Sequence, residues 1–412
     1  MNICLLCYRG NPYCGGQGVY LYFLSRELAR LGHHLTILVG SPKPRPMPWA
    51  KTVHVESLNL WGVRRNFISP QSLWRIFHPL NFFEFGITRW GFFPEMLIFS
   101  LRAFRWLREN QRDFSFDIIH DVQSLGYGLI PMKLFGLPLV TTVHHPLTVD
   151  FQAGMERSKN FWAKYYTVVF YPLGMQGRVI RHCDRVITSS WQSAKEIEQA
   201  FGVPPSRIRM VYNGLDVDFF KPNDGGTIPF RKGLLFVGNT DDPKKGISYL
   251  LQALALLPQE VFLTIVDDGR PGKTYAPEWV EKMGLSSRVS FTGKVPAETL
   301  RSLYRSSAAV VLPSLYEGFG LPAAEAMACG TPVVATRVGA LPEVIGEDEA
   351  GILVPPRDPQ ALARGILRVL QNEGERGKMG LAGRQRVEEF FTWRKVAERT
   401  VAVYKELVTS DG

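Results

Sequence analysis

The chain has 412 residues, of which 45% are hydrophobic and 21% are charged, and its formal net charge is +10. This length and composition exclude a disordered or fibrous protein and predict two or three globular domains. No run of about 18 uncharged apolar residues indicates a membrane span, and the opening NICLLC lacks the pattern of a signal peptide.

Charge and cysteine usage indicate the compartment and the kind of partner. Residues 1–200 contain 22 Lys and Arg against 13 Asp and Glu, a net charge of +9, so this half is expected to meet something anionic. Charge alone leaves anionic lipid, a phosphorylated acceptor and nucleic acid open. The cysteines are scattered and odd in number, which favours the reducing cytoplasm: Cys4, Cys7, Cys14, Cys183 and Cys329.

The first forty residues predict a strand (NICLLCY), a turn-forming loop (RGNPYCGGQG), a helix from Val19 to Leu31 and a second strand (HLTILV). Such a βαβ start indicates a parallel sheet, which the strands FDIIH, PLVTTVH, RVITSS and IRMVYN continue. Cys4 and Cys7 form a C-x-x-C pair, but no second pair completes a zinc site, so both are expected inside the first strand.

Residues 61–110 fit this alternation poorly. They contain thirteen aromatic residues and seven arginines but only three acids. Rings mixed with arginine suit a membrane interface, where aromatic side chains lie at the headgroup level and cations meet anionic lipid. The alternative is that the rings fill the core of a helical insertion, and the sequence leaves both interpretations open.

A second series of strands and helices follows a segment rich in Gly, Pro and Asp (DVDFFKPNDGGTIPFRKG). Its strands are LLFVGN, VFLTIVDDG, RVSFTG, AAVVLPS and TPVVAT. We therefore predict an α/β protein with two doubly wound, Rossmann-like parallel-sheet domains that face each other across a cleft. The predicted parts are a first domain (1–216, with the insertion at about 61–110), a linker (217–232), a second domain (233–384) and a returning C-terminal helix (385–412).

The segment PSLYEGFGLPAAEAMACGTPVVAT, residues 313–336, carries the sharpest chemical signal. It predicts a strand that ends near Pro313, a glycine-flanked turn and a helix that begins near Pro322. The backbone N–H groups of such a helix start bind phosphate. Glu317 in the turn can then face a sugar hydroxyl while Glu325 in the helix faces a ribose. A solvated pair of glutamates is the alternative.

This stretch resembles the E-x7-E element of family-four retaining glycosyltransferases, which have the GT-B architecture. Further segments resemble the family in the expected order: GGQGVYLYFLSRELARLGHHLTIL, VYNGLDVDFFKP, FVGNTDDPKKGISYLLQAL, VSFTGKVPAETLRSLYRSSAAVVLPS and AGILVPPRDPQALARGI. The resemblance implies a retaining hexosyltransferase whose co-substrate is a nucleotide diphosphate sugar.

The resemblance also implies roles for individual residues. Glu317 would contact the transferred sugar, Glu325 would bind the ribose, and Lys245 would neutralise the leaving diphosphate. Further donor contacts would come from Gly15, Gly16, Gly293, Lys294, Val295, Gly318, Phe319, Gly320 and Leu321. The chain departs from the family at Asn239, where an arginine is common. Lys244 or Arg9 would compensate, or stabilisation of the leaving group is weaker.

Histidines follow two strands of the first domain. In DIIHDVQ, the match to the family's HDWQ makes His120 the predicted catalytic histidine, although another register places Val122 there. Asp121, His144 and His145 are predicted on the acceptor side, because open α/β sheets bind ligands at the carboxyl ends of their strands.

The predicted reaction needs no essential metal and no cofactor besides the nucleotide sugar. Asp216 and Asp218 spell D-x-D, the metal motif of another transferase architecture, but here Asp216 is predicted to be a turn residue. The acceptor is expected to be anionic or lipid-linked, with the enzyme cytoplasmic or peripheral on the inner membrane face, and nucleic acid is not expected. The alternatives are a sugar-nucleotide epimerase, a phosphorylase, or a basic membrane- or nucleic-acid-binding protein with an idle fold.

Overall fold

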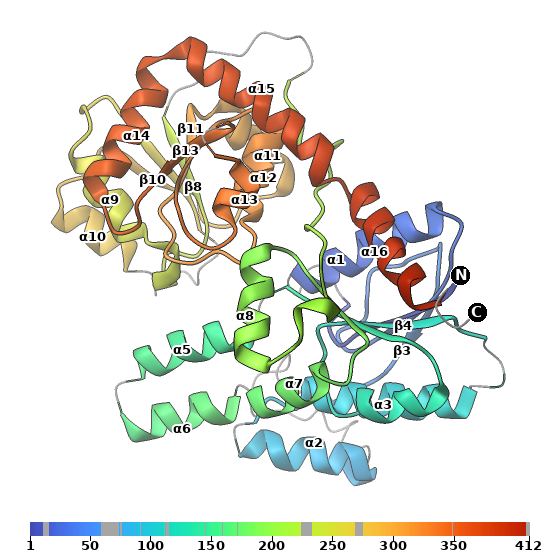
Figure 1. The fold of residues 1–412 in the computed structure, drawn as a ribbon. Coiled ribbons are helices and arrows are strands. Elements are labelled where there is room, and N and C mark those ends of the chain that lie inside the picture. The colour runs from blue at the N-terminus through green and yellow to red at the C-terminus, as the bar shows by residue number, and fades with distance from the viewer. Residues whose placement is uncertain are drawn as a thin grey trace. The chain divides into compact units, whose positions relative to one another are not determined.

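The computed structural model describes residues 1–10, 16–58, 74, 76–90, 92–110, 112, 115–144, 146–158, 160–170, 172–223, 233–267, 275–347 and 349–408. The chain forms two compact units, coloured along the sequence in Figure 1. The first unit comprises Met1–Val211 and Trp393–Gly412, and the second comprises Tyr212–Thr392. Residues 224–232 of the predicted linker lie outside the described residues.

The first unit is built on a seven-stranded parallel sheet. Its strands, in spatial order, are β3 (Lys51–His54), β2 (His34–Val39), β1 (Asn2–Cys7), β4 (Ile118–Val122), β5 (Leu139–Val143), β6 (Arg185–Thr188) and β7 (Ile208–Met210). Its helices are α1 (Gly16–Arg30), α2 (Pro79–Arg89), α3 (Glu95–Asn110), α4 (Leu129–Met132), α5 (Leu147–Arg157), α6 (Phe161–Phe170), α7 (Leu173–Ile180), α8 (Trp191–Phe201) and α16 (Trp393–Val408).

Helices cover both faces of this sheet, so its strands are apolar on both sides. Along β1, Ile3 and Leu5 belong to the core beneath α1 and α16, whereas Cys4 and Leu6 belong to the core beneath α3 and α7. Figure 1 shows these two helix layers on opposite sides of the strands. The alternation along a strand therefore decides which helix layer each side chain meets.

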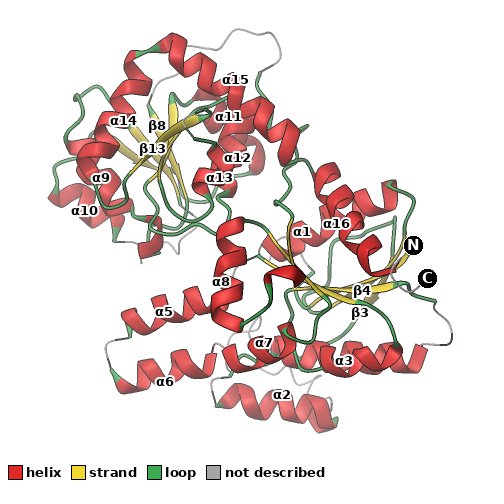
Figure 2. Ribbon diagram, viewed as in Figure 1, coloured by secondary structure: helices red, strands yellow, loops and turns green. Residues whose placement is uncertain are grey.

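The second unit is built on a six-stranded parallel sheet (Figure 2). Its strands, in spatial order, are β10 (Val289–Phe291), β9 (Leu263–Val266), β8 (Leu234–Val237), β11 (Ala309–Leu312), β12 (Val333–Thr336) and β13 (Gly351–Val354). Its helices are α9 (Ile247–Ala255), α10 (Ala276–Lys282), α11 (Ala297–Ser306), α12 (Leu321–Ala328), α13 (Leu341–Ile345), α14 (Pro359–Gln371) and α15 (Glu373–Phe390).

Both sheets have the strand order of a doubly wound fold. In each one the first strand of the unit is central, the next two lie to one side, and the chain then crosses to the other side. Ligands of such sheets bind beyond the carboxyl ends of the strands, near the point where the order reverses. The predicted class of two Rossmann-like parallel-sheet units is confirmed.

The rings of the aromatic insertion divide between the core and the surface. Of residues 61–110, the stretch 61–73 lies outside the described residues, and most of the remainder forms α2 and α3. Phe99 is buried in the core, and Phe104 and Trp106 pack against it. Six other rings of this segment are exposed, as described below. Among the described residues, no helix is long and apolar enough to cross a membrane.

Candidate active site

The loop that follows β11 presents the predicted E-x7-E element. Gly320 precedes α12 with φ of 93°, and a Cβ on it would lie 2.8 Å from Leu341 Cδ2. The backbone conformation therefore favours glycine, and a larger residue would also have to displace the Leu341 side chain. Pro322 follows in the first turn of α12, where its missing N–H costs no helix bond.

Glu317 and Lys245, 72 residues apart in sequence, meet in this loop. Lys245 Nζ donates a 2.7 Å hydrogen bond to Glu317 Oε1. Ser314 Oγ donates to the same carboxylate oxygen at 3.0 Å. The Glu317 side chain is 9% exposed and that of Lys245 is 26% exposed, so the pair lies at the edge of the core and is not sealed inside it.

A second close contact joins the two loops that carry this pair. Lys245 ends a short 3-10 turn, and Gly246 after it has φ of 65°. A Cβ on Gly246 would lie 2.1 Å from the carbonyl oxygen of Pro313, and Leu315 N donates to Lys244 O at 2.6 Å. The loops after β8 and β11 are thus held backbone to backbone, which fixes the ammonium beside the carboxylate.

Glu325 lies half-buried on α12, where Tyr304 Oη donates a 2.7 Å hydrogen bond to its Oε2. Burial raises the pKa of Glu325 to about 7, and the hydrogen bond from Tyr304 lowers it in part. Tyr304 itself is fully buried on α11. The carboxylate is therefore oriented by a rigid partner, and its charge changes near neutral pH.

The remaining donor residues predicted in the second unit lie in loops at the same edge of the sheet. Asn239 follows β8 and is exposed, and its Oδ1 accepts a 2.8 Å hydrogen bond from the N–H of Asp241. After β10, Gly293 (φ 65°) and Lys294 are exposed and Val295 packs against the core. In the motif itself Gly318 is half-buried, and Phe319 is buried 5.5 Å from the Phe391 ring.

His120, the predicted catalytic histidine, lies in the core of the first unit. It is the third residue of β4 and is fully buried, with Nδ1 2.5 Å from Tyr404 Oη and Nε2 2.7 Å from Thr142 Oγ1. Burial, with a smaller contribution from His144, lowers the pKa of His120 to about 3. Both ring nitrogens contact core hydroxyls, and the catalytic role of His120 stays a prediction.

Asp121 is also enclosed by the protein. Its carboxylate accepts hydrogen bonds from the backbone N–H groups of Ser124 and Leu125 and from Thr141 Oγ1, at 3.0–3.1 Å, and from the Ser124 hydroxyl. Burial raises its pKa to about 6, although these hydrogen bonds oppose the shift. Asp121 holds the loop after β4, and its assignment to the acceptor side stays a prediction.

The structure describes three of the other predicted residues of the first unit, His144, Gly16 and Arg9. His144 is half-buried at the end of β5, with its ring 4.6 Å from that of Tyr20. Gly16 is exposed at the start of α1. Arg9 pairs with Glu95 at 2.8 Å. Gly15 and His145 lie outside the described residues.

Sequence reasoning missed two supporting side chains, Ser314 and Tyr304. Ser314 precedes Glu317 in the quoted motif, and its position three residues ahead was a usable signal. Tyr304 carries no such signal, because only the packing of α11 on α12 brings it to Glu325. The turn role of Asp216 is confirmed, since its Oδ1 accepts a 3.1 Å hydrogen bond from Phe219 N.

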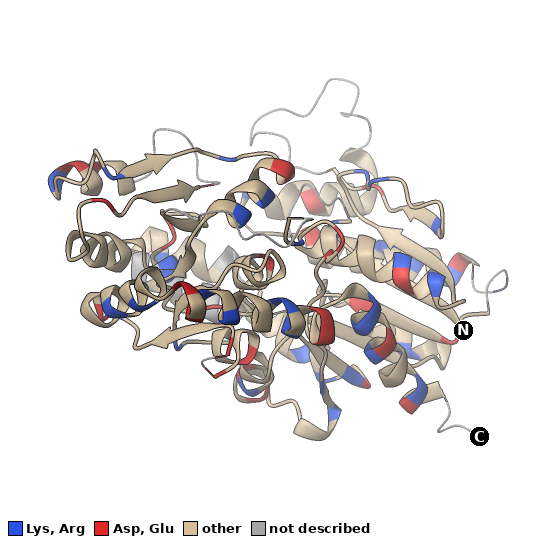
Figure 3. Cartoon of the chain, turned by 90° about the horizontal axis from the view of Figure 1, so that it is seen from above, with Lys and Arg blue, Asp and Glu red and all other residues tan. Residues whose placement is uncertain are grey.

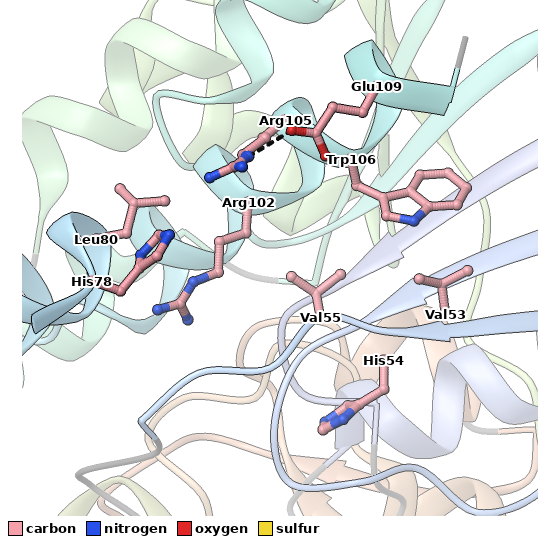
Figure 4. A pocket seen from close by; sticks show the side chains of 9 residues that line it. All are labelled: Val53, His54, Val55, His78, Leu80, Arg102, Arg105, Trp106 and Glu109. Atoms are coloured by element: carbon pink, nitrogen blue, oxygen red, sulfur yellow. Dashed lines mark hydrogen bonds and ion pairs between the residues drawn. The ribbon is translucent and has the colours of Figure 1, made fainter. Parts of the chain in front are cut away.

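A separate pocket of about 230 Å³ lies in the first unit, where α2 and α3 approach the edge strand β3 (Figure 4). Among its lining residues, Arg102 pairs with Glu84 at 2.9 Å and Arg105 pairs with Glu109 at 2.7 Å. None of the predicted donor or acceptor residues lines it. The pocket is therefore distinct from the candidate active site.

Comparison with known families agrees with this geometry. The family model described as Glycosyltransferase Family 4 matches residues 14–219, and the model described as Glycosyl transferases group 1 matches residues 227–386. This chain belongs to glycosyltransferase family 4 and is a glycosyltransferase of GT-B fold.

Individual relatives extend over the whole chain. The MMP alpha-(1->4)-mannosyltransferase of Mycolicibacterium hassiacum is 39% identical over 99% of this chain and 98% of its own length. The structure of sucrose-phosphate synthase from Thermosynechococcus elongatus superposes with a TM-score of 0.74 at 24% identity, covering 100% of both chains. Anabaena HepE in complex with UDP-glucose gives a TM-score of 0.69 at 18% identity, covering 99% of this chain and 100% of HepE.

Proposed function

We propose that this glycosyltransferase moves a mannosyl residue from a nucleotide diphosphate sugar to an acceptor hydroxyl, with retention of anomeric configuration. The contact that carries the proposal is the 2.7 Å bond between Lys245 Nζ and Glu317 Oε1 in adjacent loops. The 39% identity to a mannosyltransferase over nearly the whole of both chains supports mannose as the sugar. The UDP-glucose bound to HepE, a protein of the same fold, supports the nucleotide donor.

In the proposed reaction the acceptor oxygen attacks the anomeric carbon on the face from which the diphosphate departs. The bond from that carbon to the diphosphate oxygen breaks, and the acceptor proton passes to the leaving diphosphate. Lys245 turns from Glu317 to the diphosphate and stabilises its developing charge, which is the kind of electrostatic contribution that dominates such steps. Glu317 then accepts a hydrogen bond from the sugar, and Glu325 accepts from the ribose hydroxyls.

Backbone groups complete the proposed donor site. The amides from Gly318 to Leu321 lie at the start of α12, where N–H groups attract phosphate oxygens. Gly293, Lys294 and Val295 are proposed to meet the base. His144 and His145 remain the proposed acceptor-side residues, and Gly15 and Gly16 the proposed donor contacts from the first unit.

The function is tested by a donor screen followed by product analysis. Thermal shift with GDP-mannose, UDP-glucose and other nucleotide sugars identifies the donor, and mass spectrometry with NMR identifies the transferred sugar and its anomeric configuration. An inverted product would contradict the retaining reaction. An epimerised or phosphorolysed donor in the absence of acceptor would identify the rival enzymes, and donor binding without turnover would indicate an idle fold.

The proposed mechanism needs no essential metal, because Lys245 and the α12 amides take the role of a cation at the diphosphate. Turnover should therefore survive EDTA. Complete loss on chelation with recovery on addition of manganese would contradict this part of the proposal and return attention to Asp216 and Asp218.

A further inference from the structure

Exposed aromatic rings gather along α2 and its flanking residues in the first unit. Trp74, before the helix, exposes 83% of its surface, and Trp90, directly after it, exposes 71%. The exposed rings of this segment are Trp74, Phe77, Phe82, Phe83, Trp90 and Phe92. Soluble proteins rarely present so many large rings together unless the surface binds something.

A second exposed aromatic face lies on α6 of the same unit. Phe161, Trp162, Tyr165 and Tyr166 are all exposed, and they recur at a spacing of four residues along the helix. This spacing places them on one side of the helix. Figure 1 shows α2 and α6 both on the side of the sheet opposite to α1 and α16.

Within the described residues of α6 and of the segment 74–92, the exposed charged side chains are positive, whereas the exposed Glu109 of α3 lines the neighbouring pocket. The only acid between Trp74 and Phe93 is Glu84, which is 1% exposed and pairs with Arg102 at 2.9 Å. Arg89 is exposed at the end of α2, with its guanidinium 4.7 Å from the centre of the Phe85 ring. Lys164 is exposed and is the only charged residue of α6.

Elsewhere in the described chain, basic and acidic residues are interspersed along many elements, as Figure 3 shows. On α3, for example, Arg102 and Arg105 pair with Glu84 and Glu109. Arg102 is therefore held inside the insertion, whereas Arg105 and Glu109 form an exposed pair of opposite charges on α3. The cations at the aromatic faces differ, because the described side chains of α6 and of the α2 segment place no acid at the surface.

We propose that α2 with its flanks and α6 form a membrane-docking surface for anionic phospholipid. Trp rings favour the headgroup level, Phe rings enter the outer acyl region, and Arg89 and Lys164 meet lipid phosphates. A second copy of the chain is a poorer occupant, because a symmetric contact would bring these cations together, and the described residues of α6 and of 74–92 expose no acid to pair with them. The surface contains none of the residues assigned to the donor site.

The experiment uses the full chain and two kinds of vesicle, phosphatidylcholine alone and phosphatidylcholine mixed with phosphatidylglycerol. The wild-type protein should sediment with the anionic vesicles at low salt, remain in the supernatant with neutral ones, and dissociate as salt rises. Trp74→Gln with Trp90→Gln, and separately Phe161→Gln with Trp162→Gln, should each lower the partition coefficient by more than about ten-fold.

Two controls separate lipid contact from general changes in the surface. Phe262 and Leu381 of the second unit expose 54% and 66% of their surfaces, so Phe262→Gln with Leu381→Gln removes comparable apolar groups and should leave vesicle binding unchanged. Arg89→Gln and Lys164→Gln should each lower binding about five-fold and reduce its salt dependence.

Three results would overturn the proposal. The wild-type protein could stay in the supernatant with anionic vesicles at low salt, or the variant lacking rings on both helices could still sediment with them. Sedimentation velocity could instead show a wild-type dimer that the same substitutions disperse, without vesicle binding, which would assign the surface to a second copy. Donor binding by thermal shift, measured without vesicles, reports on the donor site separately, so the two proposals can fail independently.

Discussion

The strands β4 and β11 occupy equivalent places in the two sheets, yet their polar residues have different environments. Each lies next to the first strand of its unit, at the point where the strand order reverses. His120 and Asp121 lie inside β4 and are fully buried. Glu317 lies five residues beyond the end of β11, at the edge of the core, and contacts Lys245.

The difference teaches that the end of a strand marks a change in the surroundings of polar side chains, from the core to the edge of the core. Within β4, Ile118 and Val122 pack in the core beneath α1 and α16, and the alternation carries His120 to the same side, against Tyr404. A buried polar group must find its partners within the protein. Residues in the loop beyond the strand keep groups that can meet a substrate.

The largest effect is expected at the loop beyond β11. Glu317→Ala should nearly abolish turnover, and Lys245→Ala should lower kcat by about 10²–10³-fold, because the leaving diphosphate loses its charge partner. The double variant should lower kcat little more than the more damaging single change does, because the two side chains act as a unit. Steady-state kinetics check this, with Lys282→Ala, an exposed lysine on α10, as the control. Wild-type kinetics in both single variants would remove the donor site from this loop.

The next effect sharpens the role of Glu325. Glu325→Gln should raise the donor KM about 10- to 100-fold, because a hydrogen bond to a charged group contributes about 1.5–3 kcal/mol. Because the pKa of Glu325 is raised to about 7, the carboxylate fraction grows as pH rises through that value, so the wild-type donor KM should fall. The Gln variant should show no such dependence. Tyr304→Phe keeps the aromatic ring and removes the hydroxyl that donates a hydrogen bond to Glu325. This variant should show a KM for the donor sugar between those of wild type and Glu325→Gln.

The same raised pKa has the opposite consequence for stability. The native state keeps its proton on Glu325 up to a pH of about 7, whereas the unfolded chain releases it near 4.5. The free energy of unfolding should therefore fall as pH rises through this window. Denaturant titrations of wild type and Glu325→Gln at several pH values measure the free energy of unfolding. If this free energy depended on pH equally in both proteins, the raised pKa of Glu325 would be contradicted.

A third change tests the role of His120, which lies inside β4. His120→Ala should leave kcat and KM nearly unchanged but lower the free energy of unfolding, because unsatisfied buried hydroxyls cost about 1–3 kcal/mol each. Because the pKa of His120 is lowered from 6.5 to about 3, wild-type stability should fall as pH drops through this window, and the variant should lose that slope. The exposed His182→Ala serves as the control. A large loss of kcat with unchanged stability would instead support the catalytic role that the sequence predicts for His120.

The smallest effect is expected at Asn239. Asn239→Arg removes a 2.8 Å hydrogen bond to the N–H of Asp241 but adds a cation in the loop that follows β8. An exposed turn bond contributes only about 1 kcal/mol, so the protein should fold and turnover should rise modestly. Asn239→Gln lengthens the side chain without adding charge, so comparing the turnover of the two variants isolates the effect of the positive charge. A strong loss in the Arg variant alone would show that this loop does not tolerate the charge.

The sequence by itself determined the class of fold and the loop that carries the candidate site. Its apolar strands, spaced by helical segments, predicted two parallel sheets, because βαβ units impose that arrangement locally. The residues from Glu317 to Glu325 were found because their turn, proline and helix signals are contiguous. Gly320 and Pro322 act on neighbouring backbone, and such short-range constraints can be predicted from a string of letters.

Only the tertiary structure decided the environment of each polar side chain. The bond between Lys245 and Glu317 depends on two loops 72 residues apart, and the burial of His120 depends on Tyr404, 284 residues away on α16. A shift of one residue along β4 would have turned the histidine to the other helix layer. The same holds for the rings of the insertion: Phe99 is buried and Trp90 is exposed, because packing against α3 and the sheet, and not composition, fixes which surface each ring meets.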